Sequence, residues 1–191
     1  KEDLLPMIAP PKVKLHYVVQ SSYGKYGTSI PVALAYEAME KPDESVVVLM
    51  GDDCIYNADG SSEVANLLEQ TPEGECAMLG VEVPREDVSR YGVIAMSDQQ
   101  EFISIVEKPS QEASPSNLIN VSKYVLNPTA LAAVCAHAAS EQTGEYYITD
   151  PINRVVAEGT RLKVVPAHGA YLDAGTLEGW LAANELVVRG H

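Results

Sequence analysis

The sequence has 191 residues, 46% of them hydrophobic, which is enough to bury one substantial core, so we expect a single domain over residues 1–191. Its formal charge of −14, from 13 basic and 27 acidic residues, argues against nucleic acid and against an anionic membrane as partners. No apolar run approaches the roughly 18 residues of a membrane span, and the acidic opening Lys1-Glu2-Asp3 is not typical of a signal peptide.

The cysteines indicate a reducing compartment. Cys54, Cys76 and Cys135 are too far apart for a zinc knuckle, and their odd number argues against a disulfide framework. We therefore expect a cytoplasmic protein. The chain begins without Met, in a stretch that resembles the middle of a helix, so we also expect that an upstream segment is absent.

The first half of the chain predicts strands that alternate with helices. The expected elements, in chain order, are a strand over Lys12–Val19, a glycine-rich loop over Ser21–Thr28, a helix from its cap at Ser29 to about Met39, a central strand over Ser45–Met50, a helix over Ser61–Glu69 and a buried strand over Cys76–Val83.

The second half continues this alternation. It predicts strands over Tyr91–Met96, Phe102–Val106, Leu118–Leu126 and Leu162–Val165, and helices over Pro128–Ala139, Asp150–Glu158 and Thr176–Val188, the last with Leu177, Trp180, Leu181 and Val188 on one side. This order predicts the α/β class, with a mixed sheet covered on both faces and an antiparallel excursion near Tyr91–Val106.

Two segments combine an apolar run with a glycine and an aspartate. Asp52, followed by Asp53, comes at the exit of an apolar strand, and Asp173 precedes Gly175 in a similar arrangement. Ligands of α/β sheets bind at the carboxyl ends of strands, and two carboxylates that face each other suit Mg²⁺, which fills its remaining positions with phosphate oxygens and water. The alternative interpretation is that each aspartate caps a helix or stabilises a turn.

Two further motifs could bind a ligand. Glu107-Lys108-Pro109 ends a strand, so the Lys could hold a phosphate while the Glu accepts hydrogen bonds from hydroxyls; a surface salt bridge is the alternative. The amide of Gln20, near Gly27, could read the edge of a base, although a plain loop is equally reasonable.

These segments, with several others, occur in the order found in bacterial UTP–glucose-1-phosphate uridylyltransferases. The chain resembles that family from about its first residue to its last, through Val48-Leu49-Met50-Gly51-Asp52-Asp53, Tyr91-Gly92-Val93-Ile94, Ile105-Val106-Glu107-Lys108-Pro109, Pro115-Ser116-Asn117-Leu118, Lys123-Tyr124-Val125-Leu126, Gly144-Glu145 to Thr149-Asp150, and Tyr171-Leu172-Asp173-Ala174-Gly175.

The resemblance implies a three-layer α/β/α Rossmann-like fold with a mixed sheet, lacking its N-terminal part. It also implies Mg²⁺-dependent transfer of a uridylyl group from UTP to glucose 1-phosphate, which gives UDP-glucose and pyrophosphate. The roles that it implies are metal binding by Asp52 and Asp173, catalysis by Asp52 and Lys108, and substrate binding by Gln20 (uracil), Gly27 (under the base), Asp53, Gly92 (sugar), Glu107 (sugar hydroxyls) and Lys108 (sugar phosphate).

The sequence departs from the family pattern in two places. Ser122-Lys123-Tyr124 stands where the family has Gly-Arg-Tyr. The opening of the family, a glycine-rich G-x-G-T-R segment followed by P-x-T-K and P-K, supplies the Arg and Lys that hold the triphosphate, and it is not found in the 191 residues. We therefore expect this chain alone to have little or no activity. The alternatives are a dTTP–glucose-1-phosphate or other sugar-1-phosphate nucleotidyltransferase, and a non-catalytic relative that binds sugar nucleotides. Relatives are commonly dimers or tetramers, so a homo-oligomer is also expected.

Overall fold

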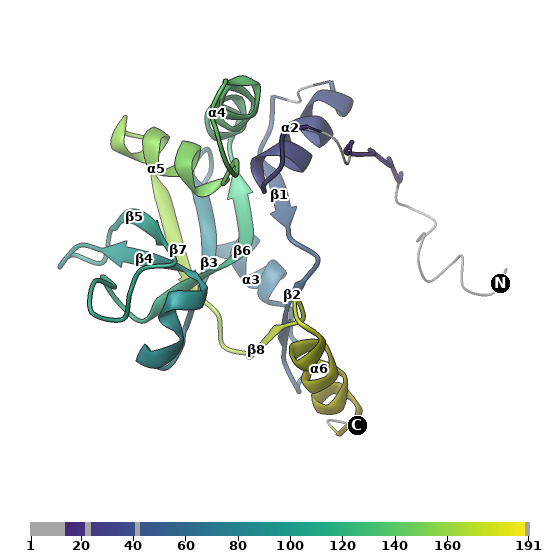
Figure 1. The fold of residues 1–191 in the computed structure, drawn as a ribbon, viewed down its shortest axis with the longest axis vertical. Helices are drawn as coiled ribbons and strands as arrows, with labels where there is room; N and C mark the ends of the chain where they lie inside the picture. The colour runs from purple at the N-terminus through teal and green to yellow at the C-terminus, as the bar shows by residue number, and fades with distance from the viewer. Residues whose placement is uncertain (1–13, 22–23, 41–42, 190–191) are drawn as a thin grey trace, which may run out of the picture.

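A six-stranded mixed sheet forms the body of the molecule in the computed structural model, which describes residues 14–21, 24–40 and 43–189 (Figure 1). The strand order is β5-β4-β6-β3-β7, and β1 also pairs with β6. The strands are β1 (Val46–Leu49), β3 (Cys76–Glu82), β4 (Gly92–Met96), β5 (Phe102–Glu107), β6 (Leu118–Leu126) and β7 (Leu162–Pro166).

β6 is the strand around which this sheet is built. One of its edges pairs with β3, while the other pairs with β4 at Ile119 and with β1 from Lys123 to Leu126. All three pairings are antiparallel, and β3 and β7 are parallel. The antiparallel part of the sheet is therefore larger than expected. The prediction that β1 is the central strand is wrong, because within the described residues β1 pairs with β6 alone and Val47 and Leu49 are exposed.

Ser122 marks the point where β6 changes partner from β4 to β1. Its φ of 53° lies in the left-handed region, which costs a residue other than glycine on the order of 1 kcal/mol. The Ser122 carbonyl accepts the Met50 N–H at 3.2 Å, and its own N–H donates to Asn120 Oδ1 at 3.1 Å. The glycine of the family pattern is thus a conformational requirement that serine meets here with strain.

Helices cover both faces of the sheet. The helices α2 (Ser29–Ala38), α4 (Pro128–Ala139) and α5 (Thr149–Ala157) pack on one face around Met78 and Leu131. The helix α3 (Glu63–Gln70) and the 3₁₀-helix η2 (Arg85–Arg90) cover the other face around Leu67 and Val88. The predicted three-layer α/β fold with a mixed sheet is confirmed.

A separate two-stranded sheet positions the predicted metal-binding aspartates Asp52 and Asp173. β2 (Asp53–Tyr56), which was not predicted, pairs antiparallel with β8 (Ala170–Asp173), and α6 (Leu177–Arg189) follows β8. Figure 1 shows these elements together at one end of the molecule, away from α4 and α5. The buried Glu63 ties them to the body, because its Oε1 accepts the N–H groups of His168 at 2.8 Å and Gly169 at 3.0 Å.

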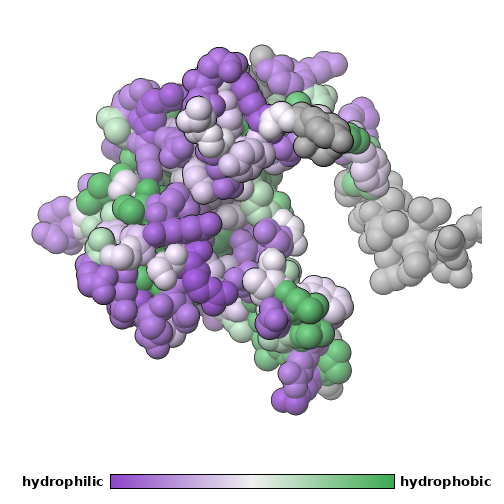
Figure 2. Space-filling view, in the orientation of Figure 1, coloured by the Kyte–Doolittle hydropathy of each residue, from purple (hydrophilic) through white to green (hydrophobic). Residues whose placement is uncertain are grey.

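Two local predictions are wrong. Residues 14–19 of the first expected strand are exposed and irregular, since no described strand pairs with them, and residues 12–13 lie outside the described residues. The cap of α2 is Thr28 rather than Ser29, which is buried as the first helical residue. The helix expected at the end of the chain is present as α6, and its apolar side chains are exposed, as the green surface over that helix shows in Figure 2.

The described part of the chain contains no helix that is both long and apolar enough to cross a bilayer.

Candidate functional site

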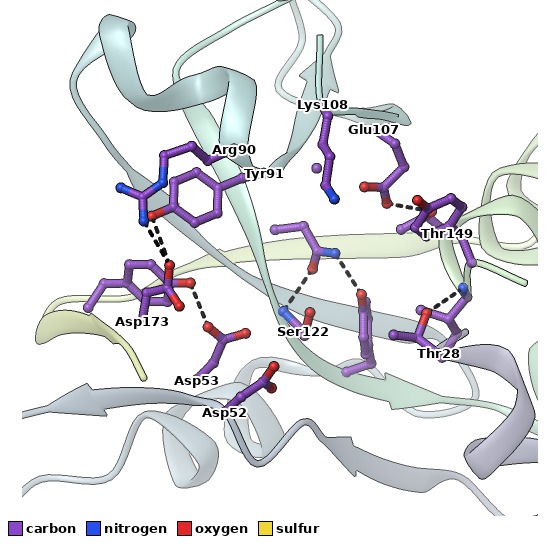
Figure 3. Close-up of a pocket in the computed structure, with 16 residues that line it drawn as sticks. Thr28, Asp52, Asp53, Arg90, Tyr91, Glu107, Lys108, Ser122, Thr149 and Asp173 are labelled. Carbon is purple, nitrogen blue, oxygen red and sulfur yellow. Dashed lines mark hydrogen bonds and ion pairs between the residues drawn. The ribbon is translucent and has the colours of Figure 1, made fainter. Parts of the chain in front are cut away.

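A cavity of about 260 Å³ lies where β6 changes partner and the chain passes from β1 into β2. Six of the eight predicted site residues line it: Asp52, Asp53, Gly92, Glu107, Lys108 and Asp173. In Figure 3, the three aspartates lie on one side of the cavity, and Glu107 and Lys108 lie across from them. The remaining lining residues are Thr28, Arg90, Tyr91, Asn120, Ser122, Tyr124, Tyr147, Ile148, Thr149 and Tyr171.

The pairing of β2 with β8 brings the acidic residues together. Asp53 lies directly opposite Asp173, and the Asp52 carbonyl accepts the Ala174 N–H at 2.8 Å. A methyl group built on Gly175 would lie 3.2 Å from Asp173 Oδ1 and 3.7 Å from Asp52 Oδ2. These two carboxylate oxygens are therefore no more than about 7 Å apart, which is the sum of those distances.

Asp52 and Asp173 offer the type of oxygen ligand that a hard divalent cation shared with a bound ligand would use. Two carboxylate oxygens suit Mg²⁺, which commonly takes one or two carboxylates and completes its shell with phosphate oxygens and water. The described residues contain no group of three or more His, Cys, Asp or Glu side chains that could hold a metal ion. A bound phosphate would therefore have to supply part of the shell, and Asp52 and Asp173 are the residues that would hold the cation.

Asp53 is engaged by a neighbour within the protein. The Tyr171 hydroxyl donates to Asp53 Oδ1 at 2.6 Å. Burial raises the pKa of Asp53, and the Tyr171 hydrogen bond and the Lys123 ammonium oppose that rise. Burial also raises the pKa of the Tyr171 hydroxyl, so this group donates a hydrogen bond at neutral pH.

Asp173 has two partners at the end of η2. Its Oδ2 accepts from Arg90 Nη2 at 3.1 Å and from the Tyr91 hydroxyl at 3.4 Å. The Arg90 guanidinium lies 5.3 Å from the centre of the Tyr91 ring, and the Tyr91 and Tyr171 rings meet edge to face at 5.9 Å. Arg90, Tyr91 and Tyr171 were not predicted from the sequence to have a role, although Tyr91 and Tyr171 are the first residues of two of the motifs quoted above.

Glu107 and Gly92 face each other across the pairing of β4 with β5. A methyl group on Gly92 would lie 3.1 Å from Glu107 Oε1, so glycine leaves room for this carboxylate. The Thr149 hydroxyl donates to the same oxygen at 2.7 Å, and burial raises the pKa of Glu107. No role was predicted for Thr149 from the sequence.

Lys108, the residue after Glu107, lies at the cavity and has an unusual backbone conformation. Its φ of 43° is left-handed, and its N–H donates to the Tyr91 carbonyl at 2.9 Å. The exposed side chain points into the cavity toward Asp52 (Figure 3). Within the described part of the chain, Glu107 and Lys108 do not form the mutual salt bridge that the alternative interpretation requires.

Gln20 and Gly27 do not line the cavity. Gln20 is exposed, and its amide donates to the Lys25 carbonyl at 3.4 Å. Gly27 has a φ of 117°, and a methyl group on it would lie 2.5 Å from the Tyr146 backbone nitrogen. Packing against Tyr146 is thus sufficient to explain why this position is glycine. The next residue, Thr28, does reach the cavity.

Lys25 fixes this loop to the end of α4. Its ammonium donates to the carbonyls of Ala138 and Ala139, both at 3.2 Å, and of Ser140 at 2.6 Å. It also pairs with Glu141 at 3.3 Å. A cation at the carboxyl end of a helix satisfies free carbonyls and interacts favourably with the helix dipole.

Comparison with known proteins is consistent with this geometry. The chain matches the family model described as nucleotidyl transferase over residues 2–189. It is 31% identical over 152 residues to a UTP–glucose-1-phosphate uridylyltransferase of Pseudomonas aeruginosa, covering 74% of this chain and 52% of that protein. It is 30% identical over 149 residues to one of Mycoplasma pneumoniae, covering 74% and 50%.

A solved structure, that of UDP-glucose pyrophosphorylase complexed with UDP-glucose, matches with a TM-score of 0.76 at 26% identity, covering 92% of this chain and 66% of that one. The chain spans about half the length of the curated relatives that it matches. The resemblance seen in the sequence is confirmed, and with a family model that matches nearly all of its residues, this chain belongs to the nucleotidyl transferase family.

Proposed function

We propose that the protein transfers a uridylyl group from UTP to glucose 1-phosphate and forms UDP-glucose and pyrophosphate. The observation that carries the proposal is the cavity in which Asp52 and Asp173 face Glu107 and Lys108. Relatives about 30% identical are named for this reaction. The four side chains supply cation ligands, an acceptor for hydroxyl groups and a positive charge for a phosphate.

In the proposed reaction, a phosphate oxygen of glucose 1-phosphate attacks the α-phosphorus of UTP in line, and pyrophosphate leaves. Lys108 would hold the sugar phosphate, and Glu107, oriented by Thr149, would accept hydrogen bonds from sugar hydroxyls. A Mg²⁺ ion held by Asp52 and Asp173 would offset the negative charge that develops on the phosphates. Gly92 would allow the sugar to approach the backbone, and Asp53, held by Tyr171, would support the acidic side of the cavity.

We propose that Gln20 and Gly27 recognise uracil. This assignment follows from the family resemblance alone, since neither residue lines the cavity. The amide of Gln20 is exposed and offers both a donor and an acceptor, as reading of a base edge requires. Substitution of Gln20 by alanine should therefore weaken UDP-glucose binding more than glucose 1-phosphate binding.

The charge balance of the cavity bears on the activity of this chain by itself. Its described lining includes two cations, Lys108 and Arg90, against four carboxylates, and the whole chain carries a charge of −14. A triphosphate would be held weakly under these conditions. We therefore propose that the 191-residue chain binds UDP-glucose with Mg²⁺ but turns over UTP slowly or not at all.

Two experiments test the proposal. Calorimetric titration of the chain with UDP-glucose, dTDP-glucose and ADP-glucose in Mg²⁺ should show preference for UDP-glucose; preference for dTDP-glucose would favour the thymidylyl reaction, and no binding would contradict the proposal. A pyrophosphate-release assay with UTP, dTTP and glucose 1-phosphate addresses turnover. Rapid release with UTP would support the reaction and refute the proposed weak activity.

A further inference from the structure

Arg90 connects two parts of the molecule at the predicted metal site. It is the last residue of η2, its side chain is 53% exposed, and its guanidinium reaches Asp173 at the end of β8. Its second anionic neighbour is Asp87, at 3.9 Å on the same short helix. Among the described lining residues, Arg90 and Lys108 are the only cations.

Both oxygens of the Asp173 carboxylate already accept hydrogen bonds. Oδ1 accepts the Gly175 N–H at 3.1 Å, while Oδ2 accepts from Arg90 and from the Tyr91 hydroxyl. A cation between Asp52 and Asp173 would need a lone pair of this carboxylate, and it would repel a guanidinium bound to the same group. Arg90 and the cation therefore compete for Asp173.

We propose that Arg90 is a positioning residue that exchanges partners when the site is filled. Without metal, it holds the Asp173 carboxylate at the cavity. When the cation binds, Arg90 releases Asp173, and its guanidinium binds a phosphate of the nucleotide sugar from the same side of the cavity. The inference rests on the metal site of the proposed function and adds a specific competitor for one of its ligands.

The physical basis of the exchange lies in geometry and charge. Arg90 is long and half exposed, and stacking near the Tyr91 ring keeps its guanidinium at the cavity wall whichever anion it binds. A guanidinium binds phosphate oxygens in the same forked geometry as a carboxylate. A diphosphate brought in with a divalent cation would thus replace the charge partner that Arg90 loses.

The exchange predicts effects of opposite sign for one substitution. Arg90→Met removes the competitor for Asp173 and should tighten binding of Mn²⁺ alone by about fivefold. The same variant lacks the phosphate contact, so it should bind UDP-glucose about tenfold more weakly in saturating Mn²⁺. If Arg90 only anchored β8 to η2, its loss would misplace Asp173 and weaken both.

The test is titration with Mn²⁺ followed by electron paramagnetic resonance of the free ion, and calorimetry with UDP-glucose. Arg161→Met is the matched control, because Arg161 also pairs with a carboxylate, that of Glu75, and loses the same charge outside the cavity. Its Mn²⁺ and UDP-glucose affinities should stay within twofold of those of the native chain. Arg90→Lys, which keeps the charge, should give affinities between those of the native chain and Arg90→Met, and thermal unfolding of each variant verifies its fold.

The outcomes separate this inference from the proposed function. Mn²⁺ binding by the native chain that Asp173→Asn abolishes, together with tighter Mn²⁺ binding by Arg90→Met, supports both. The same loss with Asp173→Asn, but equal or weaker Mn²⁺ binding by Arg90→Met, overturns the exchange and leaves the metal site in place. Absence of Mn²⁺ binding in the native chain and in Arg90→Met overturns both.

Discussion

Replacing Gly92 by alanine tests whether the Glu107 carboxylate must lie where the structure places it. The added methyl group would be 3.1 Å from Glu107 Oε1, 3.3 Å from Oε2 and 3.0 Å from Ile105 Cγ2. These contacts are tighter than nearly all real Cβ contacts, so the carboxylate has to move by a few tenths of an ångström. The φ of Gly92 is not left-handed, which means that alanine adds contact strain without backbone strain.

The expected magnitude follows from what the carboxylate contacts. Overpacking of this kind costs about 1–3 kcal/mol of stability. Displacement of Glu107 would also lengthen its 2.7 Å bond from Thr149 and any bond to a sugar hydroxyl. A hydrogen bond to a charged group contributes about 1.5–3 kcal/mol, and 1.4 kcal/mol is a factor of ten, so UDP-glucose should bind about 10- to 100-fold more weakly.

Gly80→Ala is the matched control for this substitution. A methyl group on Gly80 would lie 3.1 Å from side-chain atoms of Leu118 and Val164, so it adds a similar crowding within the apolar core instead of at the cavity. Calorimetry with UDP-glucose and urea unfolding should show that both variants lose stability and that only Gly92→Ala loses affinity. Unchanged affinity in Gly92→Ala, or an equal loss in Gly80→Ala, would refute the role given to Glu107.

Three other substitutions probe how the cavity walls are held, each by urea unfolding. Lys25→Met removes the ammonium that donates to three carbonyls at the end of α4 and should lower the free energy of unfolding by about 1–2 kcal/mol, so an unchanged midpoint would contradict the anchoring role. Burial alone would raise the pKa of Glu63, but hydrogen bonds, led by that from the His168 N–H, lower it below its ordinary 4.5. The ionised Glu63 carboxylate therefore contributes its full stabilisation of the fold above pH 4.5, and this contribution is lost as the pH falls through the lowered pKa. The difference in unfolding free energy between the native chain and Glu63→Gln should accordingly shrink below pH 4.5. A difference that stays constant would contradict the lowered pKa of Glu63. Tyr171→Phe removes the hydroxyl that donates to Asp53 and should cost about 1–2 kcal/mol at pH 7 with a smaller loss in acid, where the carboxylate is protonated; a loss that does not change with pH would exclude this hydrogen bond as its cause.

Much of the fold could be predicted because its signals are local. The helix α4 begins at Pro128 and ends at Ala139 as expected, since Pro at the first turn and an Ala-rich run are properties of that segment alone. The strand β2 was missed because four residues of mixed polarity form a strand only when they pair with β8, more than a hundred residues away. The central position of β6 likewise depends on pairings that no single segment specifies.

In the candidate site, too, some residues have a local signal in the sequence and others depend on distant contacts. Asp52, Asp173, Glu107 and Lys108 could be proposed because each ends an apolar run with a charged side chain. That all four line one cavity depends on the fold, because they come from distant parts of the chain. Arg90 has no such local signal, because an arginine that ends a short polar segment is usually a solvated surface residue, and its contact with Asp173 spans 83 positions of the chain.

The central claim is that Asp52 and Asp173 bind a divalent cation together with a sugar nucleotide. The most direct test is calorimetric titration of the chain with UDP-glucose, once in the presence of Mg²⁺ and once in the presence of EDTA. We expect Mg²⁺ to increase the affinity of the native chain at least tenfold, and we expect Asp52→Asn to remove that increase while its stability stays within about 1 kcal/mol, because Asp52 is exposed. Equal affinity of the native chain in Mg²⁺ and in EDTA, or a full Mg²⁺ effect in Asp52→Asn, would contradict the claim.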